Sequence, residues 1–149
     1  MKPSLVTFDQ TVIRFCKAMS FPVARIAIFI VYAWFGFLKV IGASPASPLV
    51  ADLLHAILPF LSFHSFIIGF GIFEVSIGIL FLFPKLDRIS ILAFAIHMLM
   101  TCGVLVMLPA VAWSAPFVPT LEGQYVIKNI AFIALVITLA SHIEPMRRK

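Results

Sequence analysis

Charged side chains are scarce in this sequence. Of its 149 residues only 11% are Asp, Glu, Lys or Arg, whereas 62% are hydrophobic, and the mean hydropathy is +1.14. Soluble domains carry about 25% charged and about 45–50% apolar residues. A water-facing domain cannot bury so much apolar surface, so the composition argues against a soluble protein and predicts a chain whose solvent is a lipid bilayer.

Cysteine is also scarce, because the chain has only Cys16 and Cys102, and they form no CxxC pair. A structural disulfide would need both thiols on one side of the membrane, which the topology predicted below disfavours. Thiol–disulfide relay chemistry is disfavoured with it. The sequence also has no HExxH or ExxH pattern, and we predict no metal site.

Lys and Arg are missing from two stretches, residues 43–64 and 109–124. Outside the apolar runs, the basic residues lie in residues 2–25, in the PKLDR segment at 84–88 and at 147–149. Because cytoplasmic segments carry an excess of Lys and Arg, these three regions are predicted to be cytoplasmic and the two stretches to face outward. The net charge of +5 then reflects membrane topology, which argues against a nucleic-acid partner.

Most of the sequence consists of long apolar runs. Each run is long enough to cross ~30 Å of hydrocarbon as a helix. The predicted spans are residues 21–42, 65–83, 89–108 and 125–141. We therefore predict an all-α integral membrane protein, a bundle of four transmembrane helices in a single domain over residues 1–149. An even number of spans agrees with both termini lying in the cytoplasm.

Two amphipathic segments outside the spans are predicted to be short helices lying in the membrane interface. One covers residues 7–19, before the first span. The other lies in the first outer loop, where Ser47 can cap a helix that starts at Pro48.

Glu74 is the most informative residue, because it lies near the middle of the second span. An Asp, Lys or Arg at such a depth costs about 2.5–3.5 kcal/mol to insert, so intramembrane charges normally face the bundle and find a partner. Gly71, Glu74 and Gly78 share one helical face, which predicts close contact with another helix. Glu74 is either a protonated structural residue that is hydrogen-bonded across helices or a functional acid.

Lys39 shares a face of the first span with Arg25, Tyr32 and Gly36. Helical side chains lean toward the N-terminus, so Lys39 leans toward the membrane centre, and Glu74 on the antiparallel second span leans toward Lys39. A contact between Lys39 and Glu74, direct or through a ligand, is one interpretation. The other is a simple interface anchor whose ammonium reaches the outer surface.

His97 lies near the centre of the third span, on a face with Ser90 and Thr101. It is either a helix-packing hydrogen-bond partner or a partner of Glu74 in a proton-exchanging or ligand-holding pair.

The start of the fourth span places polar residues at the outer rim, where they either anchor the helix or complete a polar pocket. The predicted pocket residues are Lys39, Glu74, His97, Glu122, Tyr125 and Lys128. A lipid-soluble ligand with polar ends, such as a quinone, would suit a pocket of this kind.

Three motifs, RIAIFIVYAWFGFLK, GFGIFEVSIGILFL and EGQYVIKNIAF, resemble the DoxX-like superfamily of small bacterial membrane proteins. The similarity runs from about Arg25 to Glu144 and favours the branch of the reactive-chlorine-resistance inner-membrane protein. His97 matches no motif of that superfamily. The matching positions are Arg25, Trp34, Gly36, Lys39, Glu74, Gly78, Lys128 and Asn129.

The resemblance implies a four-helix protein of the bacterial inner membrane. We predict structural or packing roles for Arg25, Tyr32, Trp34, Gly36, Gly71, Gly78 and Asn129. Some relatives are membrane subunits linked to quinone-dependent oxidoreductases, and others are tied to oxidant or thiol stress.

We therefore expect a redox- or stress-associated membrane subunit with a quinone-like ligand. Membrane lipids surround such a subunit, and a redox protein or a second copy of the chain is its expected partner. Two alternatives stay open: a proton-coupled transporter or channel that uses Glu74 and His97, and a non-catalytic scaffold in stress protection.

Overall fold

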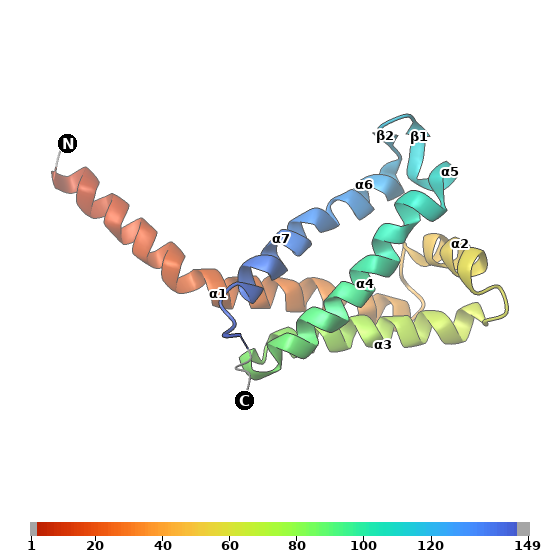
Figure 1. Ribbon diagram of the computed structural model, residues 1–149, viewed down its shortest axis with the longest axis horizontal. Helices are drawn as coiled ribbons and strands as arrows, with labels where there is room; N and C mark the ends of the chain where they lie inside the picture. Colours follow the sequence, from red (N-terminus) through yellow and green to blue (C-terminus); the bar gives the residue numbers. More distant parts are fainter. Residues whose placement is uncertain (1–2, 146–149) are drawn as a thin grey trace.

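The computed structural model describes residues 3–145, and it describes side chains from residue 5 onward. Nearly all of this chain is helical (Figure 1). The elements are α1 (Pro3–Val40), α2 (Ser47–Ile57), α3 (Phe63–Phe81), η1 (Pro84–Leu86), α4 (Asp87–Met107), α5 (Pro109–Ala112), β1 (Trp113–Ala115), β2 (Val118–Pro119), α6 (Leu121–Ile127) and α7 (Asn129–Ala140).

Four helical segments are long and apolar enough to cross a membrane, which are the segments expected of a multi-pass membrane protein. They are Leu5–Val40, Phe63–Phe81, Pro84–Met107 and Leu121–Ala140. Successive segments run in opposite directions and form a bundle (Figure 1). The outward faces are apolar, as Leu99 and Val106 show with 79% and 81% of their surface exposed. A surface of this composition suits lipid and not water.

The first span differs from the prediction, because no separate helix precedes it. Residues 7–19 belong to the same continuous helix as the span, and that helix contains Pro22. Proline removes one backbone hydrogen bond and crowds the preceding turn, which bends a helix. The first part of α1 accordingly runs at an angle to the rest (Figure 1).

The helix predicted in the first outer loop is present as α2, but its start is shifted by one position. Ala46 occupies the N-cap position and makes no side-chain cap, while Ser47 lies inside the helix. The proline near the start supplies the fixed backbone angle that helix entry needs, so the helix forms without a side-chain cap.

Glycine brings α1 and α3 into close contact, as the small-residue face predicts. A Cβ atom at Gly36 would lie 2.5 Å from the carbonyl oxygen of Gly71, and a Cβ at Gly71 would lie 2.6 Å from that of Gly36. Two turns further along the same face of α3, a Cβ at Gly78 would lie 3.1 Å from the carbonyl oxygen of Phe29. The two backbones approach to a distance that only glycine allows.

Two apolar clusters fill the bundle. The larger cluster joins α1, α3, α4 and α7, and its fully buried members include Ile28 and Ile77. The smaller cluster lies at the other end, where Val104, Ala112 and Val126 pack under α2 and a two-stranded antiparallel ribbon of β1 and β2. The fourth span is interrupted at Lys128, between α6 and α7.

Candidate functional site

A buried ion pair joins α1 to α3. The Lys39 Nζ atom lies 2.6 Å from Glu74 Oε2, and each residue exposes only 5% of its surface. Lys39 lies one turn beyond Gly36, and Glu74 one turn beyond Gly71, so the glycine contact sets the separation of the two side chains. In the structure the Lys39 ammonium therefore pairs with the Glu74 carboxylate and does not reach the outer surface.

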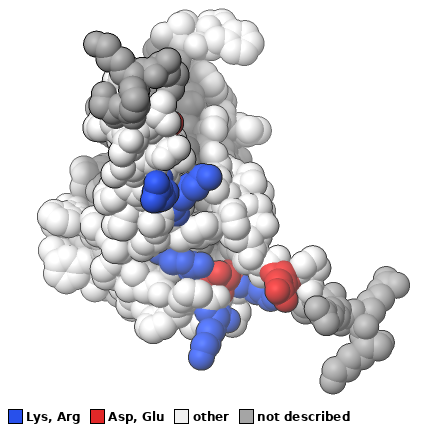
Figure 2. Space-filling model, turned by 90° about the vertical axis from the view of Figure 1, so that its left-hand side faces the viewer, with Lys and Arg blue, Asp and Glu red and all other residues white. Residues whose placement is uncertain are grey.

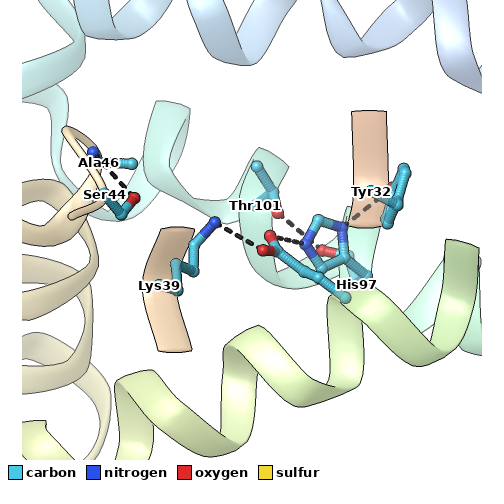
Figure 3. A network of polar contacts seen from close by, with 7 residues as sticks. Tyr32, Lys39, Ser44, Ala46, His97 and Thr101 are labelled. Atoms are coloured by element: carbon cyan, nitrogen blue, oxygen red, sulfur yellow. Dashed lines mark hydrogen bonds and ion pairs between the residues drawn. The ribbon is translucent and has the colours of Figure 1, made fainter. Parts of the chain in front are cut away.

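His97 extends this pair onto α4. Its Nε2 atom lies 2.8 Å from Glu74 Oε1, so the two carboxylate oxygens are shared between Lys39 and His97. Thr101 donates a hydrogen bond to the carbonyl oxygen of His97 at 2.9 Å (Figure 3). The structure shows that His97 contacts Glu74 between α4 and α3, a contact that fits both alternatives for His97.

Tyr32 completes the set from α1, because its hydroxyl lies 3.2 Å from His97 Nδ1 (Figure 3). An ionised carboxylate can only accept, so His97 Nε2–H donates to Glu74, and Nδ1 shares a hydrogen bond with the tyrosine hydroxyl. We call Lys39, Glu74, His97 and Tyr32 the polar chain.

Phe70 covers the polar chain on one side. Its ring is stacked on the imidazole of His97 with 5.2 Å between centroids, and Lys39 Nζ lies 5.6 Å from the same ring centroid. Within the described residues, no buried side-chain nitrogen or oxygen lacks a hydrogen-bond partner. The polar chain is therefore closed and internally satisfied, as buried charges must be.

The rim residues lie apart from the polar chain. Tyr125 is 60% exposed, and the Lys128 ammonium lies 4.9 Å from its ring centroid. Glu122 is exposed as well, and Asn129 is half-buried. Of the six residues predicted for one pocket, the structure gathers Lys39, Glu74 and His97 and leaves the three from the fourth span on the surface.

Trp34 was expected to pack in the bundle, but 65% of its surface is exposed. It lies two positions from Tyr32 and Gly36 and therefore points away from the face that contacts α3. A tryptophan on this side of α1 faces the surroundings of the bundle.

No family model, curated protein or solved structure matches the chain. The resemblance to the DoxX-like superfamily therefore stays a prediction from the motifs. What the polar chain does must be inferred from its own chemistry.

Arg25 has a partner that the sequence analysis did not identify. Its guanidinium makes two 2.7 Å contacts with the Asp87 carboxylate and donates to the carbonyl oxygen of Phe81 at 2.9 Å. Asp87 begins α4, where a carboxylate also stabilises the helix N-terminus. Opposite charges at the predicted cytoplasmic ends of the first and third spans were the signal for this pair.

Phe70 and the tyrosine hydroxyl were also missed as parts of the site. Tyr32 was placed on the correct face, but its hydrogen bond to His97 depends on how α4 crosses α1. Three or more His, Cys, Asp and Glu side chains come together nowhere in residues 3–145 in a way that could hold a metal ion. Two hollows found in the structure lie away from the polar chain, one beside Lys17 and one at Trp113.

Proposed function

We propose that this protein is a small subunit of the bacterial inner membrane, with both termini in the cytoplasm, that binds a quinone-like ligand at the polar chain. The observation that carries the proposal is the continuous contact from Lys39 through Glu74 and His97 to Tyr32, buried between three apolar helices. Ionisable residues at such depth are costly and are typically functional.

A quinone fits the chemistry of this set. Its reduction to a quinol takes up two electrons and two protons at the carbonyl oxygens, so its site needs proton donors and a flat apolar wall. His97 and Tyr32 would supply the proton-exchanging groups, and Phe70 supplies an aromatic face. The electrons would come from the reduced cofactor of a partner oxidoreductase, which agrees with a role in redox balance or oxidant stress.

Tyr32 is the donor that a quinone carbonyl would engage. Its 3.2 Å contact with His97 is the longest in the polar chain, compared with 2.6 and 2.8 Å for the two contacts of Glu74. Because the chain is closed, the head group would enter by replacing that contact, and the ring would lie beside the apolar residues around it.

Mass spectrometry of the lipids that co-purify with the protein tests this proposal. We expect wild-type protein to retain a quinone and to gain melting temperature when a quinone is added. Glu74→Gln should lose both effects while Ser76→Ala, an exposed position on the same helix, keeps them. Purified protein that carries no quinone and does not respond to added quinone would overturn the proposal.

Proton transfer is the second candidate, and the length of the polar chain favours it. Lys39 and Tyr32 are seven residues apart on one helix, which spans about 10 Å of membrane depth. Contacts that cover a third of the ~30 Å hydrocarbon could pass a proton along that distance. Proton flux into liposomes should then fall in Glu74→Gln, and equal flux in wild type and variant would exclude this function.

A further inference from the structure

A hollow with both polar and apolar walls lies at the opposite end of the bundle from the polar chain. It measures about 380 Å³ and lies between the bend of α1 and the end of α7. Lys17 on its wall is 22 residues from Lys39 along α1, roughly 33 Å at 1.5 Å per residue. It is therefore a separate site.

The wall of the hollow has two kinds of surface. Lys17, Ser20, Thr138 and His142 supply polar groups. The remaining lining residues are apolar: Phe21, Ala24, Leu135 and Leu139. A molecule that matches this wall has a charged head and a hydrocarbon body.

The polar side of the hollow has an unused hydrogen-bond donor. Within residues 3–145 the Lys17 ammonium has no ion pair or hydrogen bond. His142 Nδ1 lies 3.0 Å from the carbonyl oxygen of Thr138 and 3.1 Å from the hydroxyl oxygen of Ser141. The Nε2 atom of His142 has no partner in the same part of the chain, and its ring is held edge-on against Phe21 at 4.4 Å.

The surrounding charge is positive. Figure 2 shows Lys and Arg side chains on this end of the molecule, with Asp and Glu side chains beside some of them. Arg88 at the start of α4 donates to the carbonyl oxygen of Glu144 at 2.6 Å, which brings the segment after α7 to the same end. Arg14 lies one turn before Lys17 on α1.

We propose that this hollow binds one anionic phospholipid of the adjacent membrane leaflet. The phosphate would contact Lys17, and the acyl chains would run along Leu135 and Leu139 into the bilayer. Basic pockets between membrane helices at the cytoplasmic surface recognise lipid head groups in this way. The lipid would also hold the bend of α1 against the end of α7.

Native mass spectrometry of the full chain, titrated with phosphatidylglycerol or with phosphatidylcholine of the same acyl chains, tests this proposal. We expect one phosphatidylglycerol to bind and phosphatidylcholine to bind more weakly. Lys17→Gln should weaken phosphatidylglycerol binding about fivefold, the effect of one Lys near an anionic lipid. Lys85→Gln, an exposed Lys outside the hollow, is the matched control and should leave the affinity unchanged.

Four results would overturn the proposal. Equal binding of the two lipids would show non-selective annular lipid, and equal losses in Lys17→Gln and Lys85→Gln would show a diffuse charge effect. Displacement of the lipid by millimolar inorganic phosphate would show a general anion site. Ser20→Phe, which fills the hollow without removing a charge, should also lower lipid binding, and unchanged binding in that variant would place the lipid elsewhere.

Discussion

The Lys39 ammonium and the Glu74 carboxylate lie 2.6 Å apart at a point where each residue exposes 5% of its surface. A buried ion pair gives little net stability, because removing two charges from water costs about as much as their attraction returns. Stability alone is therefore a poor explanation for this pair. Its connection through His97 to Tyr32 is the basis of the proposed role in ligand binding.

Breaking the ion pair should be more damaging than removing it. Glu74→Gln and Lys39→Met each leave one partner without its counter-charge, and each should lower the free energy of unfolding by about 3–5 kcal/mol. The double variant removes both charges and should be more stable than either single variant. Unfolding in mixed detergent micelles measures all three, and fully additive losses would contradict the pairing.

The glycine contact should tolerate no added methyl group. Gly71→Ala places a Cβ 2.6 Å from the carbonyl oxygen of Gly36, and the resulting overpacking should cost about 1–3 kcal/mol. Gly69→Ala on the same helix meets nothing within 4 Å and is the matched control. Equal thermal stability of the two variants would show that α1 and α3 do not approach as described.

The Arg25 contact should depend on the shape of the guanidinium. Arg25→Lys keeps the charge but cannot make two parallel bonds to Asp87, so melting temperature should fall. Arg14→Lys changes an exposed Arg on the same helix and should leave melting temperature unchanged. A melting temperature for Arg25→Lys that matched wild type would argue against the bidentate geometry.

The predicted topology can be tested with single cysteines in a background that lacks Cys16 and Cys102. Lys85 and Phe60 are both exposed and lie at opposite ends of α3. A membrane-impermeant maleimide added to intact spheroplasts should label Phe60→Cys and spare Lys85→Cys. The reverse pattern would invert the orientation inferred from the Lys and Arg distribution.

The length of the apolar runs predicted the transmembrane helices well. Backbone N–H and C=O groups find no water in a bilayer, and a helix lets them form hydrogen bonds within their own segment. The prediction failed at the points where a helix continues or is interrupted. Residues 7–19 were predicted to form a helix separate from the first span, yet both belong to α1, which contains Pro22. The interruption at Lys128 was missed, because no proline or glycine marks it.

The part of the polar chain that was predictable from the sequence is the contact between α1 and α3. Helical periodicity placed Lys39 and Tyr32 on one face, and the lean of helical side chains directed Lys39 toward Glu74. The way in which α4 crosses α1 and the direction in which the side chains of α6 point depend on packing between helices. The sequence of a single span does not determine that packing. His97 therefore stayed undecided, and the predicted grouping of Tyr125 and Lys128 with the polar chain is not seen.

The dissociation constant of a soluble quinone analogue for the protein in nanodiscs tests the central claim most directly. Tyr32→Phe and Tyr125→Phe each remove one hydroxyl, but only Tyr32 belongs to the polar chain. The account predicts that Tyr32→Phe weakens binding by about tenfold, the loss of one hydrogen bond, and that Tyr125→Phe matches wild type. Binding that weakened only in Tyr125→Phe, or no binding by the wild-type protein, would contradict it.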